Sequence, residues 1–525
     1  MSLYYHTIFG DGMKYLSLSI QLFVQSLICV CQGSVLDDYA ALADPCYSYS
    51  LISSSSDPYT QTQGYTLRLI SQQWRDETEV DHTIWNHWMT VIVPNTLLGP
   101  TKDTALIYID GGNHTDSAPA IDSQYRLLSA GTRSVIIVLK GVPNQPIRFL
   151  DESSGRTEDQ IIAYSWRKFL DGGDVNWPVQ LPMVKAVVKC MDAAVSFVGS
   201  SAGGSRTINH FVLTGGSKRG WTAWLTAAVD SRVIAVAPIV SDLLNMKKSF
   251  AHQWGCYGFW AGALSPYTEL GIFDEFDSPR STELINIVDP YAYSDRLTMP
   301  KFIINASGDD FFVSDGIQFY LNQLEGETYL RHVPNTDHYL SGATTSVLNS
   351  IVPFYYTVLN NLQRPLFSWT VNQDGSTTLT VTDTPLSVKL WQITNPNTRD
   401  FRRITTGSNW SSTVLTGSSG IYTAQVNAPA NGWTAYFAEL IYSGPSIGGM
   451  AYNYTFTTEM IVLPEYKPFE ADFNRDTSTD IEDLKILVNS WLTENHYRDI
   501  SPRRGVGDGI INLKDFTNFS LHWLY

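Results

Sequence analysis

The chain has 525 residues, of which 43% are hydrophobic and 16% are charged, and its net charge at pH 7 is −16. This hydrophobic content supplies a large core and excludes global disorder, and the length allows two to four domains. An acidic chain repels phosphate backbones, so nucleic acid is excluded as an expected partner.

The first predicted element is a targeting signal. A lysine precedes an apolar stretch from residue 15 to residue 30, and Gly33 offers a cleavage point. This pattern is typical of a secretory signal peptide, so we expect residues 1–33 to be removed and the protein to be secreted or associated with the cell envelope. The alternative is a membrane anchor, but Gln21 and Gln25 interrupt the run.

The cysteines outside this segment are Cys46, Cys190 and Cys256. Three thiols cannot all pair, so at most one disulfide is expected among them, and the sequence leaves its partners open. No CxxC spacing or His/Cys cluster indicates a zinc site.

Strand-like and helical segments alternate over residues 34–363. Apolar runs typical of strands cover 104–109, 134–139, 211–214, 233–240 and 301–305, and helical patterns cover 159–170, 183–198 and 221–229. The alternation predicts an α/β domain with a mostly parallel sheet. An aromatic-rich segment, about 243–299, is expected to form a cap over a pocket or, alternatively, to be ordinary helical packing.

One predicted strand-to-helix junction presents a serine among glycines, in the string Gly215-Gly216-Ser217-Lys218-Arg219-Gly220. An α/β-hydrolase lifts its nucleophile above the sheet on such a turn, so Ser217 is the candidate nucleophile and the α/β-hydrolase fold is the predicted fold. The usual pattern is G-x-S-x-G, and here an arginine replaces the second glycine. We expect Arg219 to pair with an acid such as Asp230 or Asp242.

An acid and a base follow in the order that this fold uses. The predicted strand 301–305 leads to Asp309, the candidate acid, with Asp310 as the second choice. A later strand ends in a polar loop that carries His338, the candidate base, whereas His332 falls inside the strand and is the weaker candidate. Catalysis by a Ser-His-Asp set needs no cofactor.

Two backbone N–H groups are needed to stabilise an oxyanion. The N–H of Lys218 directly follows the candidate nucleophile and is the first expected donor. The second is expected from Gly112 or Asn113, where a predicted strand runs into paired glycines, although a plain turn would give the same pattern.

The composition changes to short alternating strands rich in Thr, Ser and Asn over residues 364–464, which predicts a β-sandwich. Residues 465–525 then contain a twelve-residue loop with oxygen ligands at the spacing of an EF-hand: Asp472, Asn474, Asp476, Asp480 and Asp483. This spacing predicts a Ca²⁺ site, although Thr477 occupies the position of the usual glycine. A second copy, aligned from Arg504 to Asp515, lacks two ligands. The alternative is an acidic helix pair held by its apolar residues.

The paired loop-helix units resemble a dockerin module, and this resemblance implies a cohesin-type partner. A longer resemblance covers roughly Leu36 to Pro464. The string Ser217-Lys218-Arg219-Gly220-Trp221, together with Asp289-Pro290-Tyr291 and Gly308-Asp309-Asp310-Phe311-Phe312, resembles the PhoPQ-activated pathogenicity-related family. The resemblance implies an α/β-hydrolase core with a C-terminal β domain, and it carries over Ser217, Asp309 and His338 as the triad.

These observations predict a secreted serine hydrolase that acts on a small-molecule or polymer ester. An amide is the less favoured substrate, because nothing in the chain resembles a peptide-clamping domain. The alternative function is a secreted binding or signalling protein on a hydrolase scaffold, because one branch of the family resembles a growth-repressing signal protein.

Overall fold

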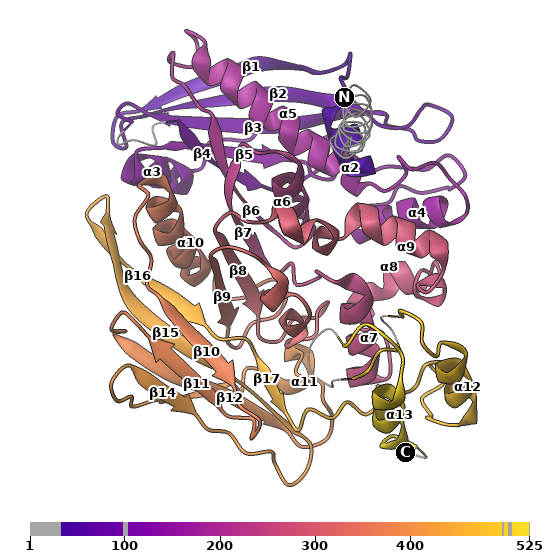
Figure 1. Ribbon diagram of the computed structural model, residues 1–525. Coiled ribbons are helices and arrows are strands. Elements are labelled where there is room, and N and C mark those ends of the chain that lie inside the picture. The colour runs from indigo at the N-terminus through magenta and orange to yellow at the C-terminus, as the bar shows by residue number, and fades with distance from the viewer. Residues whose placement is uncertain (1–32, 98–102, 496–497, 502–506, 524–525) are drawn as a thin grey trace, which may run out of the picture.

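The computed structural model describes residues 33–97, 103–495, 498–501 and 507–523. Three regions follow one another along the chain (Figure 1): a large α/β region, two antiparallel sheets at the lower left, and a small helical module at the lower right. The predicted signal peptide falls almost entirely outside the described residues. Within the described part, no helix is both long and apolar enough to cross a membrane.

The α/β region is built on a nine-stranded sheet with the order β1-β2-β3-β5-β4-β6-β7-β8-β9. The first three strands and β5 pair antiparallel, and β5, β4 and β6 to β9 are parallel. The strands are β1 Ser48–Asp57, β2 Thr62–Gln73, β3 Ile84–Pro94, β4 Thr104–Ile109, β5 Val135–Lys140, β6 His210–Gly216, β7 Val233–Ile239, β8 Lys301–Ala306 and β9 Thr328–Val333. The predicted mostly parallel sheet is confirmed, and the structure adds antiparallel pairing at the edge formed by β1, β2 and β3.

Helices cover both faces of this sheet. One face packs against α2 (Val35–Ala41), α4 (Asp159–Leu170), α5 (Gln180–Gly199) and α6 (Lys218–Val229) in the largest core cluster. The other face packs against α3 (Ser123–Thr132) and α10 (Thr344–Leu359), whose side chains join a second cluster. Alternate residues of one strand therefore serve the two clusters, as with Ile107 in the first and Leu106 in the second.

The aromatic-rich segment 243–299 folds into short helices: α7 Met246–Tyr257, η1 Gly262–Leu264, α8 Ser265–Thr268, η2 Phe273–Glu275, α9 Pro279–Val288 and η3 Pro290–Arg296. Its rings pack on one another, for example Phe250 on Phe273 with centroids 4.8 Å apart. Two further short helices, η4 (Gly316–Phe319) and η5 (Leu321–Gln323), lie between β8 and β9. The segment packs against α4 and α6 and supports the face of the sheet that those helices cover.

Residues 364–464 form two antiparallel sheets, with the orders β10-β11-β14 and β13-β12-β15-β16, and β17 pairs with β15. The elements are β10 Phe367–Val371, β11 Thr377–Val381, β12 Ser387–Asn395, α11 Arg403–Thr406, β13 Ser411–Val414, β14 Ile421–Ala424, β15 Trp433–Ile447, β16 Met450–Thr457 and β17 Ile461–Leu463. The side chains of Leu440 and Phe456 share a core cluster with Phe354 of α10. This part of the chain therefore has no separate core of its own on that side.

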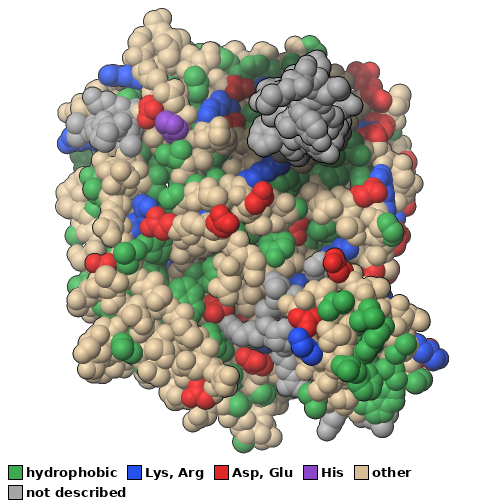
Figure 2. Space-filling model, in the orientation of Figure 1, with side chains coloured by type: hydrophobic (Ala, Val, Ile, Leu, Met, Phe, Trp, Pro, Cys, Tyr) green, Lys and Arg blue, Asp and Glu red, His purple; other side chains and the backbone are tan. Residues whose placement is uncertain are grey.

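The C-terminal module contains α12 (Ile481–Asn489) and α13 (Leu513–Ser520). Its core is small, with five buried apolar residues: Ala471, Leu487, Ile500, Ile511 and Phe519. Figure 2 shows hydrophobic side chains gathered on its outer surface at the lower right. These exposed residues are Ile481, Val488, Leu492, Ile510, Leu513, Phe516 and Leu521.

Candidate active site

The candidate nucleophile lies at the junction of β6 and α6, above the carboxyl ends of the parallel strands. Ser217 is the residue before the helix and has φ 56° and ψ −125°, a conformation that costs free energy for a residue with a side chain. Neighbouring glycines make the turn possible. A Cβ on Gly215 would lie 2.9 Å from the Ile109 carbonyl oxygen, and one on Gly220 would lie 2.9 Å from the Gly215 carbonyl oxygen.

The structure brings the predicted serine, histidine and acid into one hydrogen-bonded chain. The Oγ atom of Ser217 lies 2.8 Å from Nε2 of His338, and Nδ1 of His338 lies 2.9 Å from each carboxylate oxygen of Asp309. When the Nδ1 proton is donated to Asp309, Nε2 is left to accept the serine hydroxyl proton. His338 and Asp309 are buried and Ser217 is half-buried, so this geometry is shielded from water but open at the nucleophile.

Asp309 is held in place by its own loop. One of its carboxylate oxygens also accepts the backbone N–H groups of Phe311 and Phe312, at 2.8 and 3.2 Å. The two weaker candidates lie outside the hydrogen-bonded chain. His332 is fully buried inside β9 with its ring against Phe437, and burial lowers its pKa to about 3. The pKa of Asp310 is raised by burial and by the charge of Asp309.

The loops of the acid and of the base are joined by a residue of the β region. The backbone N–H of Arg403 donates to the Gly308 carbonyl at 3.0 Å, directly before Asp309. The guanidinium of the same arginine lies 2.8 Å from the carboxylate of Asp337, directly before His338. A Cβ on Gly308 would lie 2.7 Å from the Arg403 nitrogen, so this contact requires glycine.

Arg219 pairs with Glu158, not with Asp230 or Asp242 as expected. Its two terminal nitrogens lie 2.7 and 2.6 Å from the two carboxylate oxygens of Glu158, and its Nε donates to the Val142 carbonyl at 2.5 Å. The side chain of Lys218 lies 2.9 Å from Glu158 and from Asp159. Burial would raise the pKa of Glu158, but the hydrogen bonds and charges of Arg219 and Lys218 lower it to about 2.

This ion-pair cluster joins the turn of Ser217 to the first turn of α4. This pairing could not be predicted from the sequence, because Glu158 is distant from Arg219 in the chain and no spacing rule relates the two residues. The guanidinium also lies over Gly111, where a Cβ would be 2.7 Å from it. Replacing the usual glycine by arginine thus ties the nucleophile turn to two neighbouring loops.

The expected oxyanion donors differ in how the structure places them. The N–H of Lys218 is the first of α6, where no intrahelical acceptor exists, and the residue lines the same cavity as Ser217. The N–H of Asn113 donates to the Asp116 carboxylate at 2.7 Å. Gly112 has φ 125°, a conformation that favours glycine. The second N–H donor to the oxyanion therefore stays a prediction.

A cavity of about 610 Å³ opens at Ser217 and His338. Its walls come from β4, α3, the first turns of α4 and α6, and α10. Among the described residues that line it, none comes from 243–299, so that segment does not cap this cavity. The segment does reach the site indirectly, because Gln253 of α7 donates to the carbonyl of Phe311, whose ring lies 4.4 Å from that of His338.

Two carboxylates of the first predicted Ca²⁺ loop accept backbone N–H groups of the loop, but its acids do not form a close cluster of possible metal ligands among the described residues. Asp472 accepts the N–H groups of Asp476 and Thr477, and Asp483 accepts those of Phe473, Asn474 and Asp480. Asp480 begins α12 as its N-cap. As expected, Thr477 has a positive φ, of 73°.

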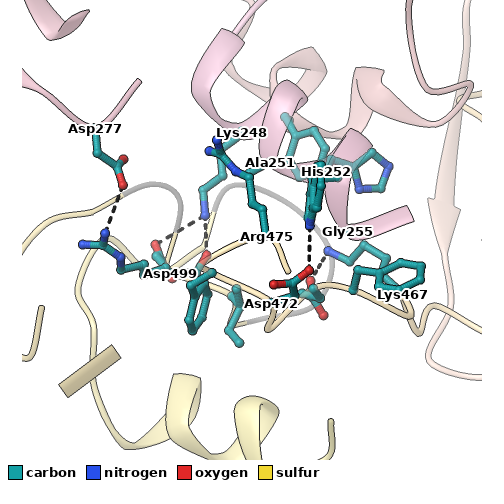
Figure 3. Close-up of a pocket in the computed structure, with 16 residues that line it drawn as sticks. Lys248, Ala251, His252, Gly255, Asp277, Lys467, Asp472, Arg475 and Asp499 are labelled. Carbon is teal, nitrogen blue, oxygen red and sulfur yellow. Dashed lines mark hydrogen bonds and ion pairs between the residues drawn. The ribbon is translucent and has the colours of Figure 1, made fainter. Parts of the chain in front are cut away.

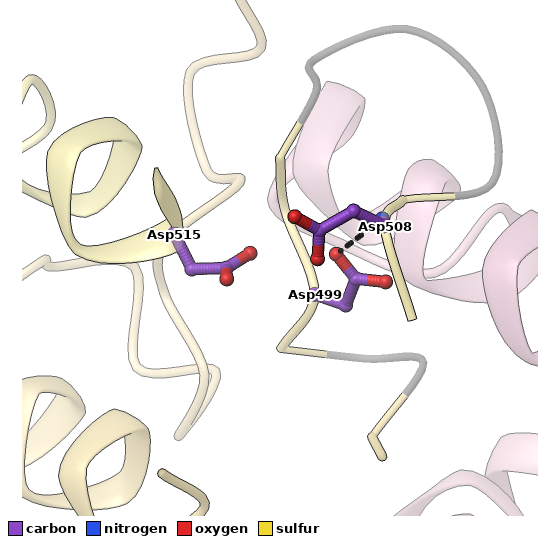
Figure 4. Close-up of side chains that lie close together, drawn as sticks. All are labelled: Asp499, Asp508 and Asp515. Carbon is purple, nitrogen blue, oxygen red and sulfur yellow. Dashed lines mark hydrogen bonds between the residues drawn. The ribbon is translucent and has the colours of Figure 1, made fainter. Parts of the chain in front are cut away.

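The second loop begins at Asp499, not at Arg504. Asp499 accepts the N–H groups of Asp508 and Gly509, as Asp472 does in the first loop, and Asp515 accepts those of Ile500, Ser501 and Asn512. Asp499, Asp508 and Asp515 converge, with one oxygen of each within 4.8 Å of the others (Figure 4). The second copy has more residues between Ser501 and Asp508 than the first loop has at the same place, so alignment by spacing alone started the copy at Arg504.

The module is anchored to α7 through a small polar pocket (Figure 3). Lys248 donates to the backbone carbonyl of Asp499, and the indole N–H of Trp254 donates to Asp472 at 3.0 Å. Arg475 stacks over Trp260 at 5.3 Å. Burial lowers the pKa of Lys248 to about 8. The segment 243–299 therefore carries the C-terminal module.

Comparison with known proteins agrees with the geometry. The model of the PhoPQ-activated pathogenicity-related protein family matches residues 36–402. The chain belongs to this family. A family relative, autocrine proliferation repressor protein A of Dictyostelium discoideum, is 38% identical over 474 residues, which covers 85% of this chain and 94% of the relative.

Solved structures with similar folds include acetyl xylan esterase 1 from Thermoanaerobacterium sp. JW/SL YS485, with 16% identity, a TM-score of 0.38 and coverage of 61% of this chain and 91% of the esterase. The acetyl xylan esterase from Paenibacillus sp. R4 has 14% identity, a TM-score of 0.39 and coverage of 60% and 91%. Scores this low carry no argument about substrate. The hydrolase interpretation of this family member therefore rests on its own sheet order and on the position of Ser217.

The cysteines among the described residues, Cys46, Cys190 and Cys256, are all free thiols, so the one disulfide that the sequence allowed is not formed among them.

Proposed function

We propose that this protein is a secreted serine hydrolase that cleaves carboxylic esters. The observation that supports the proposal best is the hydrogen-bonded chain from Ser217 through His338 to Asp309, with its serine open to a cavity. Each of the three residues stands after the carboxyl end of a parallel strand, where α/β enzymes place their chemistry.

In the proposed reaction, Oγ of Ser217 bonds to the ester carbonyl carbon while Nε2 of His338 takes its proton. The backbone N–H of Lys218 donates to the oxygen that becomes negative. His338 then returns the proton to the leaving alkoxide, and the alcohol departs. Water, activated by the same histidine, hydrolyses the acyl-enzyme. Asp309 keeps the proton of the imidazole on Nδ1 throughout.

The alternative is a secreted signalling or binding protein that keeps the scaffold. One relative carries the name of an autocrine proliferation repressor, and that name is the observation in favour of the signalling alternative. The strained φ of Ser217 and the fully formed hydrogen-bonded chain favour catalysis here, because a binding protein needs neither.

A fluorophosphonate probe tests the proposal, because it reacts only with an activated serine. We expect the wild type to be labelled and Ser217→Ala to be unlabelled. The control is Ser201→Ala, a substitution in an exposed turn, which should label as the wild type does. Absence of labelling in the folded wild type, together with saturable binding to cells, would favour the signalling alternative.

We also propose that the C-terminal module binds Ca²⁺ through Asp472, Asn474, Asp476, Asp480 and Asp483, and that it docks a cohesin-type partner. Two loops with the same hydrogen-bond pattern and an exposed apolar surface on α12 and α13 support this. Calorimetric titration with Ca²⁺ tests the first part. Heat from the wild type that is lost in Asp472→Ala is the expected result, and a titration without heat would remove Ca²⁺ from the account.

A further inference from the structure

The cavity at Ser217 has walls of two different kinds. Charged side chains lie on the wall formed by the first turns of α4 and α6. The wall formed by β4, α3 and α10 presents mainly apolar side chains and rings: Leu106, Tyr108, Tyr125, Leu128, Val347, Ile351, Val352 and Tyr355. Its polar members, at the starts of α3 and α10, are Asp122, Gln124 and Thr344. Ser217 and His338 stand where the two walls meet, so one part of a bound ester faces the apolar wall.

Two polar groups that lie among the apolar side chains of the cavity are already hydrogen-bonded within the protein. The hydroxyl of Thr214 donates to the Ala237 carbonyl at 2.7 Å, and the hydroxyl of Tyr355 donates to Ser134 at 2.7 Å. A sugar or peptide placed against Leu106, Val347 and Ile351 would lose its hydrogen bonds to water without replacement by these side chains, which is costly. A hydrocarbon chain would lose none.

The length of the apolar stripe on α10 can be compared with the length of an acyl chain. Val347, Ile351 and Tyr355 are spaced four residues apart and therefore lie on one face of the helix. The stripe extends about 12 Å along the helix axis, at 1.5 Å per residue. Exposed apolar side chains continue it at the site, because Leu348 and Tyr339 also line the cavity and are exposed.

The charged wall cannot supply an ionic contact without losing one of its own. Glu158 is engaged by Arg219 and Lys218, and Asp159 by Lys218 and by the hydroxyl of Tyr267. The charges of this wall are balanced within the protein, so the cavity selects for its ligand through the apolar side. The alcohol part of a bound ester would then lie against the charged wall.

We infer that the cavity is an acyl-chain site, and that the preferred substrate is an ester of a straight-chain fatty acid of about eight to ten carbons. An extended chain advances about 1.2 Å per bond, so this length matches the stripe. The inference rests on the proposed function, because it names the substrate class of the same serine. A cavity that held an acetyl group alone would not need a volume of about 610 Å³.

The test is hydrolysis of p-nitrophenyl esters from acetate to dodecanoate by the full chain. Each methylene buried against the wall raises kcat/KM about threefold to fourfold, so the rate should climb to octanoate or decanoate and then fall. In Val347→Phe the new ring fills the cavity, and the octanoate-to-acetate ratio should drop more than tenfold. Leu128→Phe, on the α3 side, repeats the test from a second helix.

The matched control is Asn349→Phe, which adds the same ring on α10 at an exposed position outside the cavity lining. Its chain-length profile should equal that of the wild type, and thermal melts identify any variant that fails to fold. A flat or falling profile for a wild type that hydrolyses acetate through Ser217 would overturn the inference and leave the hydrolase. The inference is also overturned if neither Phe variant changes the ratio. No hydrolysis of any ester, with no fluorophosphonate labelling, would overturn both.

Discussion

Helices begin in opposite ways in two regions of this molecule, at the Ser217 turn and in the C-terminal module. At α6 the residue before the helix is Ser217, which has an unfavourable backbone conformation and no side-chain cap. At α12 and α13 the residues before the helix are Asp480 and Asn512, and both form complete capping boxes. The first start lies in the largest core cluster, and the other two lie on a module with five buried apolar residues.

The difference shows where a protein tolerates backbone strain. Close packing around α6, the glycine contacts and the Arg219–Glu158 pair supply the free energy that holds Ser217 in its conformation. The C-terminal module lacks that support, so its helix starts use favourable caps. Its inward-facing carboxylates repel one another, which a bound cation would relieve.

The largest effect is expected from replacing Asp309, the acid that is hydrogen-bonded to His338 beside the Ser217 turn. Asp309→Asn should lower kcat by about 10³- to 10⁴-fold, because the amide stabilises the wrong tautomer of His338. Asp310→Asn is the matched control at the neighbouring residue, and it should stay within a few-fold of the wild type. Steady-state hydrolysis of an activated ester measures kcat for both variants. Equal losses of kcat in the two variants would contradict the assignment of Asp309 as the acid.

Removing the proposed Ca²⁺ ion should affect only the C-terminal module. Chelation, or Asp483→Asn in the first loop, should increase amide hydrogen exchange in α12 while that in α6 and α10 stays unchanged, since the module has little core of its own. Asp277→Asn, which weakens a surface contact to Arg498, serves as the control. Uniform loss of protection across the chain would show that the module and the hydrolase region unfold as one unit.

The ion pair that ties the Ser217 turn to α4 should be weaker than the triad but measurable. Arg219→Lys keeps the charge and loses the two-pronged contact with Glu158, so we expect a loss of about 1–2 kcal/mol in the free energy of unfolding. Activity should fall about tenfold, because the turn loses its fixed position. Arg206→Lys, an exposed arginine, is the control, and denaturant titration measures both.

The last expected effect is visible only when the pH changes, and it concerns a buried acid near the site. Burial raises the pKa of Asp242 to about 7, and Tyr320 donates to it at 2.5 Å. The folded state then holds a proton that the unfolded state releases, so the free energy of unfolding falls as the pH rises from about 4 to about 7. In Asp242→Asn this decline should shrink by about 1.4 kcal/mol for each pH unit of the interval. Thermal melts at pH 4.5 and pH 8 measure it, and identical slopes would contradict it.

Local patterns in the sequence were enough to locate the three residues of the hydrogen-bonded chain. Each stands at the end of an apolar strand, and a parallel sheet brings such ends together. The partner of Arg219 and the bridge through Arg403 could not be found this way, because both depend on which loops meet after folding. The second acidic loop was misaligned because its insertion breaks the regular spacing on which the comparison of the two copies relied.

The contact of Arg403 with both site loops has a consequence for biosynthesis. Residues before 364 contain Ser217, Asp309 and His338, yet the loops of the acid and the base are clamped by a residue that leaves the ribosome later. A nascent chain that has not yet released its β region therefore lacks this bridge between the two loops. The last of the contacts that hold the two loops can form only after residue 403 has been synthesised and the β region has folded.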